Sequence, residues 1–183
     1  MKLAKQLMRP LAILVFFARA WVPAEATTLQ QLSLGEMAEK ATSIVRARVT
    51  GSRAVVRGAD VYTLYRIEAL ETLKPGSAVS EVAVPGGVAG GIRQVVAGAP
   101  ALRAGQEYVL FLWTGRSGLT QLLGLSQGVF MVEHTASGDL RASRAAAGEQ
   151  MLDAAGHAAQ DQAVSMAWAE MRAKVTSMAA GRR

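Results

Sequence analysis

Short stretches in which apolar and polar residues alternate occupy most of the middle of the chain. Val45, Ala47 and Val49, for example, alternate with arginines, a pattern that places apolar side chains on one face of a β-strand. Strand patterns recur roughly every ten residues, at 44–50, 61–73, 79–84, 92–96, 107–113, 119–123 and 129–133. The pattern predicts a mainly β domain built as a small antiparallel barrel or sandwich.

Stretches rich in glycine and proline separate these strands. Residues 51–60 are predicted to form a polar turn, and Lys74-Pro75-Gly76 ends the second strand because proline cannot donate to a ladder. The main loop is 85–91, whose glycines are candidate contacts for a ligand or partner: Gly86, Gly87, Gly90 and Gly91. Loops that cradle phosphate lead into a helix, whereas a strand is predicted here. A flexible hairpin or a barrel-closing loop is therefore favoured.

Helical patterns lie at the two ends of residues 27–183. Ser33 and Glu36 have the spacing of a capping box, which predicts a short helix before the first strand. From Arg141 onward alanine dominates, and one apolar helical face is formed by Val164, Trp168, Met171, Val175 and Met178. We therefore predict a helical carboxy-terminal segment, 141–183, that packs on a β-barrel domain, 27–140.

The first 26 residues have the three parts of a cleavable signal peptide. Basic residues precede the apolar run 11–17, and Ala24 and Ala26 are small residues at the positions that a signal peptidase recognises. Cleavage is expected between Ala26 and Thr27. A membrane anchor is the alternative, but Arg19 interrupts a run that is shorter than the roughly 20 residues of a spanning helix. The product is expected to be periplasmic or extracellular, without stable membrane insertion.

Removal of this leader lowers the net charge of the chain, and export makes the lack of cysteine informative about the cell compartment. The whole chain carries a net charge of +6, and the leader has four basic residues against Glu25, so about half of the excess positive charge is lost with it. An exported chain with no cysteine has no disulfide and no thiolate, which favours a bacterial envelope. With His134 and His157 as its two histidines, no metal site or cofactor is expected.

One motif suggests catalysis. Gly124-Leu125-Ser126-Gln127-Gly128 fits the pattern of a serine-hydrolase nucleophile elbow, and Asp153 and His157 follow it in the appropriate order. An elbow requires a helix directly after the serine, whereas 129–133 is predicted as a strand. A turn between strands is therefore favoured, and a side-by-side Asp153–His157 ion pair on an exposed helix is favoured over a catalytic pair.

Three arginines are predicted to share an outward face of the first two strands: Arg46, Arg48 and Arg66. A basic face on a small barrel is typical of nucleic-acid binders. Export removes that partner, so an acidic glycan, a lipid headgroup or another envelope protein is the preferred ligand class. A solvated face without a ligand is the simpler alternative.

Residues 41–133 resemble a group of small, exported, uncharacterised bacterial proteins. The shared features are an Ile44-Val45-Arg46 strand, Leu73-Lys74-Pro75-Gly76, a Pro85-Gly86-Gly87 loop, Gly98-Ala99-Pro100, the strand Gly105-Gln106-Glu107-Tyr108-Val109-Leu110-Phe111-Leu112, and Gly124-Leu125-Ser126-Gln127-Gly128. More distantly, the first two strands are similar to those of netrin-like and metalloproteinase-inhibitor domains. That resemblance implies an OB-like barrel, but the inhibitors act through an amino-terminal cysteine that this chain lacks.

These observations lead to three hypotheses. The first is a non-enzymatic binding or accessory module of the bacterial envelope, built as an OB-like barrel with a short amino-terminal helix and a carboxy-terminal amphipathic helix. The second is an exported serine hydrolase that uses Ser126. The third is a structural or assembly protein that docks through the helix containing Trp168.

Overall fold

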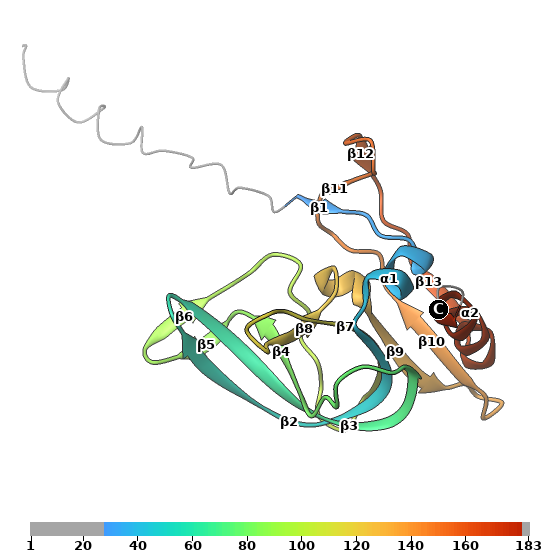
Figure 1. Ribbon diagram of the computed structural model, residues 1–183, viewed down its shortest axis with the longest axis horizontal. Helices are drawn as coiled ribbons and strands as arrows, with labels where there is room; N and C mark the ends of the chain where they lie inside the picture. The colour runs from blue at the N-terminus through green and yellow to red at the C-terminus, as the bar shows by residue number, and fades with distance from the viewer. Residues whose placement is uncertain (1–27, 181–183) are drawn as a thin grey trace, which may run out of the picture.

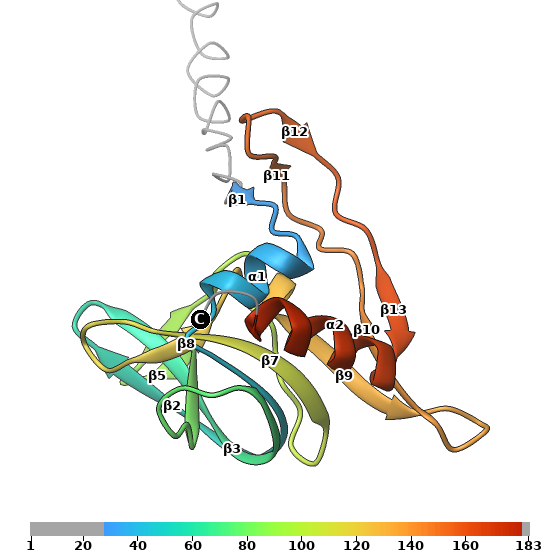
Figure 2. The ribbon, with the colours of Figure 1, turned by 45° about the vertical axis from the view of Figure 1, so that its right-hand side comes forward.

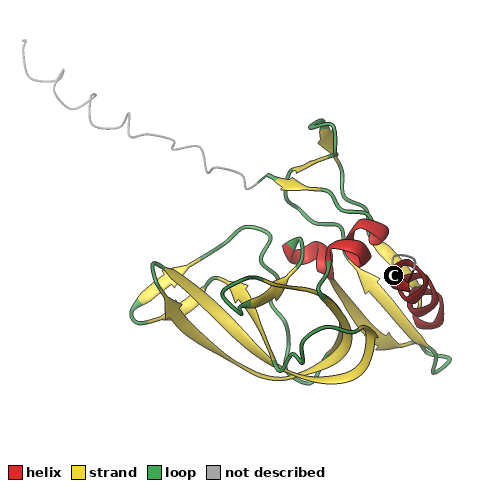
Figure 3. Cartoon of the chain, in the orientation of Figure 1, coloured by secondary structure: helices red, strands yellow, loops and turns green. Residues whose placement is uncertain are grey.

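The computed structural model describes residues 28–180, which form a mainly β structure with two helices (Figure 1 and Figure 3). The longer strands are β2 (Ser43–Arg57), β3 (Asp60–Lys74), β4 (Glu81–Pro85), β7 (Glu107–Thr114), β9 (Val129–His134) and β10 (Leu140–Arg144). The shorter strands are β1 (Leu29–Gln30), β5 (Gly87–Ala89), β6 (Ile92–Gln94), β8 (Thr120–Leu122), β11 (Met151–Leu152), β12 (Ala158–Ala159) and β13 (Val164–Ala167). The helices are α1 (Leu34–Lys40) and α2 (Trp168–Ala180), with a 3-10 turn, η1 (Leu125–Gly128). Each of the seven predicted strands overlaps an observed one.

Eight strands form one large sheet in the order β13-β10-β9-β7-β2-β3-β4-β8. Strand β8 pairs with both β4 and β7, so part of the sheet curls back on itself. Most pairs are antiparallel, but β4 and β8 run parallel through Ala83 and Gln121, because β4 pairs antiparallel with β3 and β8 with β7, and both β3 and β7 are antiparallel to β2. The predicted antiparallel arrangement is therefore mostly confirmed, but the sheet is mixed.

The hairpin of β2 and β3 is longer than the sequence predicts. Residues 51–57, expected in a polar turn, pair with β3 as far as Arg57 and Asp60, and the turn is Gly58–Ala59 alone. The register shifts between Val49, which pairs with Ile67, and Gly51, which pairs with Arg66, so a bulge, and not a turn, absorbs Thr50. The polar residues 52 and 53 face water from an exposed part of the hairpin, which explains why the strand pattern is weak there.

Helix α1 has the predicted capping box. The Ser33 Oγ accepts a hydrogen bond from the Glu36 amide at 3.2 Å, and the Glu36 carboxylate accepts one from the Ser33 amide at 2.8 Å. At the other end of the helix, Lys74 Nζ donates to the carbonyls of Ala38 and Glu39 at 2.9 Å. Both ends of a helix with only seven residues are thus satisfied.

The carboxy-terminal segment is helical only from Trp168. The prediction of helix from 141 is wrong for the part before it, which contains β10, β11, β12 and β13. Strand β10 pairs with the edge of β9, and β13 pairs with the edge of β10. The hydrogen bonds between these strands override the helical preference of alanine. Within α2, Trp168, Met171 and Val175 are buried as predicted. Val164 lies in β13 and Met178 is exposed, so the helical face is shorter than expected.

A small arm stands away from the large sheet (Figure 2). In it β1 pairs parallel with β11, and β11 pairs antiparallel with β12. The buried side chain of Gln127 connects the amino-terminal segment to the sheet, because its Oε1 accepts from the Leu32 amide at 2.8 Å and its Nε2 donates to the Gln30 carbonyl at 3.0 Å. Gln127 is thus a structural residue at the base of the arm.

Two apolar clusters fill the structure on opposite faces of the sheet. The first lies beneath α1 and α2 and includes Phe111, Phe130 and Met171. The second lies within the curled part of the sheet and includes Val82, Tyr108 and Leu110. Strand β7 contributes alternate side chains to both clusters, which explains its uninterrupted apolar sequence. Within residues 28–180, no helix has the length and apolar character needed to cross a membrane.

Candidate functional site

The predicted signal-peptidase residues Ala24, Ala26 and Thr27 lie outside the described residues. The other candidate residues can be placed. They fall into three regions: the glycine-rich segment at the far end of the β2–β3 hairpin, the arginines of β2 and β3, and the turn that contains Ser126.

The glycine-rich segment forms a β-hairpin, β5–β6, that packs on the distal half of β2 and β3. Gly86 and Gly87 have φ angles of 100° and 135°, which side-chain-bearing residues rarely adopt. A Cβ atom on Gly87 would also lie 2.7 Å from Thr63 Oγ1. These glycines therefore allow a close approach of two backbones. The structure gives a steric reason for them that needs no ligand.

Polar contacts fix this hairpin in place. Thr63 Oγ1 donates to the Gly86 carbonyl at 2.9 Å, and the Gly86 amide donates to the Val61 carbonyl at 2.7 Å. The Gln94 Oε1 accepts from the Val61 amide at 2.6 Å, while its Nε2 donates to Asp60 Oδ1 at 3.3 Å. The hairpin is thus held by bonds at both of its strands.

The held hairpin carries apolar side chains into solvent. Val88 and Ile92 are 64% and 48% exposed, and the adjacent Val56 of β2 is 43% exposed. Arg57 and Arg93 are exposed next to them in the sequence. The five residues surround the ends of the two hairpins and do not share one face: Val88 pairs with Arg93 on one side of the β5–β6 hairpin, whereas Ile92 pairs with Ala89 on the other. We call this hairpin end the distal surface: Val56, Arg57, Val88, Ile92 and Arg93.

Most of the large apolar residues that are exposed in the described part of the chain lie in or next to the distal surface. Six large apolar residues are exposed within 28–180, and the three of the distal surface are joined by Val95, which follows β6 and is 81% exposed. The other two, Trp113 and Met178, lie on other elements. Gly90 helps to build the surface, since a Cβ atom there would lie 3.1 Å from Val56. Gly91 has a φ of 76° in the turn, and a Cβ atom there would meet open space.

The arginines on the first strand are engaged in ion pairs. Arg46 and Arg48 contact Glu107 at 3.2 and 2.6 Å, and Arg46 also lies 3.9 Å from Glu71. The Arg46 guanidinium lies 5.4 Å from the centre of the Trp168 ring. These contacts join β2, β7 and α2, so Arg46 and Arg48 have structural partners. Arg66 lies further along the β2–β3 hairpin, where it pairs with Gly51, and a Cβ atom on Gly51 would be 3.0 Å from its Nη2.

The turn with Ser126 differs from a nucleophile elbow. Residues Leu125–Gly128 form the 3-10 turn η1, and strand β9 follows directly. The Ser126 Oγ is buried and has no hydrogen-bond partner among the described residues. Asp153 and His157 are an exposed pair at 3.4 Å, as predicted, but they lie in the turn between β11 and β12, so their expected place on a helix is wrong. His134 ends β9 at the surface, as expected.

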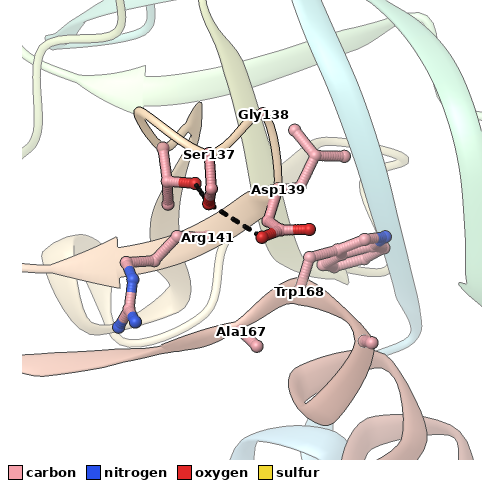
Figure 4. Close-up of a pocket in the computed structure, with 9 residues that line it drawn as sticks. Ser137, Gly138, Asp139, Arg141, Ala167 and Trp168 are labelled. Carbon is pink, nitrogen blue, oxygen red and sulfur yellow. Dashed lines mark hydrogen bonds between the residues drawn. The ribbon is translucent and has the colours of Figure 1, made fainter.

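Two cavities lie near the helices. One, of about 510 Å³, is bounded by the β9–β10 turn and the start of α2; there Ser137 Oγ donates to Asp139 Oδ2 at 2.8 Å beside Trp168 (Figure 4). The other, of about 570 Å³, lies between the amino-terminal segment and residues 153–164. The hydroxyl and carboxylate groups of the first cavity bind one another, and Arg141 turns away to Ser165 at 3.0 Å. No group of three acidic, histidine or cysteine residues suited to a metal occurs in the described part of the chain.

The second cavity has a buried ion pair in its wall. Arg144 donates to both carboxylate oxygens of Asp161 at 2.7 and 2.9 Å, and the Ala147 amide donates to Asp161 Oδ2 at 2.7 Å. Burial by itself would raise the pKa of Asp161, but the hydrogen bonds from Arg144 and Ala147 outweigh it and lower the pKa below its usual 3.8. The pair joins β10 to the segment that returns from the arm.

Comparison with known proteins leaves the function to be argued from these residues. No protein-family model matches the chain, and no curated protein matches it. The resemblances to exported bacterial proteins and to netrin-like domains therefore stay predictions. Sequence reasoning names the glycines of the β5–β6 hairpin and misses Val56, Val88 and Ile92. The signal is present, since aliphatic residues interrupt a glycine-rich segment, but the alternation pattern does not show their exposure.

Proposed function

We propose that the protein is an exported, non-enzymatic binding module that contacts its partner through the distal surface. The observation that carries the proposal is the group of three exposed aliphatic side chains on hairpins whose backbones are fixed by hydrogen bonds. Exposed apolar groups gathered in one place mark interaction sites more often than isolated ones do. A fixed hairpin also loses little conformational entropy on binding, which favours recognition.

We also propose that the domain is an OB-like barrel. The support is the order of strand pairing around the curled part of the sheet. Strands β2, β3 and β4 form a meander, β4 pairs parallel with β8, and β7 pairs with both β8 and β2. A five-stranded, partly open barrel has this order. The distal surface then lies where the hairpin of the first two barrel strands meets the β5–β6 hairpin.

The third part of the proposal is export with cleavage before Thr27. We expect the protein recovered from the periplasm or the medium to have the intact mass of residues 27–183. Replacing Ala24 and Ala26 with arginine is expected to stop processing, because the peptidase accepts small residues at these positions. An exported product that retains Met1 would contradict cleavage.

The binding role of the distal surface can be tested by site-specific photocrosslinking in cells that export the protein. A photoreactive residue in place of Val88 is expected to give a defined adduct, identified by mass spectrometry, because Val88 is the most exposed aliphatic residue of this surface. The matched control is the same residue in place of Ala173, which is exposed on α2. Equal adducts from both positions, or none from position 88, would contradict the proposal.

The apolar face of α2 is less suited to this role. Trp168, Met171 and Val175 are covered by the first apolar cluster, which leaves Met178 as the exposed large apolar residue of the helix. Docking of a partner on this face would require α2 to separate from the first apolar cluster. The distal surface requires no such rearrangement.

A further inference from the structure

We infer that the partner of the distal surface is an anionic lipid layer, an inference that rests on the proposed function. Its three aliphatic side chains would enter the interface between headgroups and acyl chains, and its two arginines would contact lipid phosphates. The same five residues supply both contributions, and each can be examined separately.

The apolar contribution comes from the end of two adjacent hairpins. Val56 lies one residue before the end of β2, and Val88 and Ile92 lie in β5 and β6 on either side of a turn. Gly90 and Gly91 have φ angles of 57° and 76°, so the turn is tight and its end is narrow. Figure 1 places these hairpin ends at the opposite side of the molecule from α2. A projecting end of this kind can enter a lipid surface without moving the rest of the domain.

Two arginines of the distal surface supply its positive charge. Arg57 and Arg93 are exposed and form no ion pair within residues 28–180. Asp60 is the carboxylate opposite Arg57 in the β2–β3 register, and its Oδ1 accepts a hydrogen bond from Gln94 Nε2 at 3.3 Å, so this end carries two arginines against one carboxylate. Two unpaired arginines beside exposed aliphatic groups are complementary to a surface that offers phosphates above an apolar layer.

The size of the surface favours a lipid layer over a folded protein. A stable protein interface needs about 800 Å² from each partner, formed by roughly 20 to 30 residues. The distal surface has five residues at the end of two hairpins, and Val95, which follows β6, is one further exposed aliphatic residue. Lipids rearrange around a projecting hairpin end, whereas a folded partner would need a matching groove. An acidic protein partner is therefore the alternative outcome of the experiment.

The experiment measures sedimentation of the mature chain, residues 27–183, with vesicles. One set contains phosphatidylcholine alone, and the other contains phosphatidylglycerol as one third of the lipid. We expect at least about 10-fold stronger partitioning onto the anionic vesicles, weakened by added salt, because each arginine near an anionic surface favours binding. Equal partitioning onto both sets, or none onto either, would overturn the inference.

Two double variants separate the contributions. Val88→Ser with Ile92→Ser removes the apolar part, and Arg57→Gln with Arg93→Gln removes the charge; each is expected to weaken partitioning about 10-fold. The charge-matched control is Arg103→Gln with Arg116→Gln, since these arginines are exposed elsewhere and form no ion pair among the described residues. The apolar control is Met178→Ser. If the controls weaken partitioning as much as the test variants, the distal surface is not the lipid contact.

The vesicle and crosslinking experiments can fail separately. If vesicles do not bind but the probe at position 88 captures one protein, the binding role of the distal surface stands and the lipid inference is wrong. If neither gives a signal, both are wrong. Unchanged thermal unfolding of each variant establishes that a loss of binding does not arise from loss of the fold.

Discussion

Asp161→Asn is expected to lower the free energy of unfolding by about 3 to 5 kcal/mol at pH 7, because it leaves a buried guanidinium without its counter-charge. The Arg144 and Asp161 side chains are only 8% and 3% exposed, and Asp161 accepts three of the hydrogen bonds that hold this region. Urea unfolding of the two proteins measures the difference. The matched control is Glu170→Gln, which alters an ion pair with Lys174 that is about half exposed and is expected to cost less than about 0.5 kcal/mol.

The Arg144–Asp161 pair also predicts how the loss of unfolding free energy in Asp161→Asn varies with pH. The pKa of Asp161 is lower in the folded than in the unfolded chain, so the pair contributes its full stability above the unfolded pKa. That contribution is lost as the pH falls through the folded pKa, because the carboxylate is then protonated in the native state. The penalty of Asp161→Asn should therefore be constant from pH 7 to about 5 and should shrink below about 4. A penalty that is unchanged at pH 3 would contradict this assignment.

Gly128→Ala is expected to lower the free energy of unfolding by about 3 kcal/mol, the upper end of the usual cost of overpacking. A Cβ atom on Gly128 would overlap the Leu123 carbonyl oxygen and would lie 3.3 Å from that of Phe111. Leu123 directly follows β8, and its hydrogen-bonded backbone cannot move aside as a flexible side chain can. The Leu123 amide bonds to the Phe111 carbonyl at 2.8 Å, so a shift would also strain that contact.

Gly148→Ala is the control for this prediction. A Cβ atom on Gly148 would have no other atom within 4 Å, and the residue has no positive φ, so the change is expected to stay within about 0.5 kcal/mol. Thermal or urea unfolding of both variants gives the comparison. If Gly128→Ala were as harmless as the control, close backbone approach would not explain the second glycine of the Gly124–Gly128 motif.

The Gly124–Gly128 motif shows the limits of a short pattern. The sequence fits a nucleophile elbow, but Gly124 has a φ of 66° in the turn and Gly128 allows two backbones to meet. Gln127, which the pattern leaves unspecified, holds the amino-terminal segment through two hydrogen bonds. Three of the five residues thus have roles in the fold that the pattern does not describe.

The distal surface shows a different limit. The glycines at 86–91 indicate the correct segment, but the sequence pattern points to the glycines themselves as the contacts. The structure gives Gly87 a steric role and places Val88 and Ile92 in solvent. Exposure depends on what packs against each side of a hairpin. That information lies in β2 and β3, which precede the segment in the chain.

Features that depend only on neighbouring residues can be predicted from the amino-acid sequence. The alternating strands, the apolar strand β7 and the capping box of Ser33 and Glu36 each need only local spacing, so they could be predicted. Other features arise from contacts between segments that are distant in the chain. The extension of β2 to Arg57, the strands between 140 and 167, and the ion pairs of Arg46 and Arg48 all depend on a partner strand that no local spacing specifies. A strand is stable only when a neighbour accepts its hydrogen bonds, and no local pattern states where that neighbour will lie.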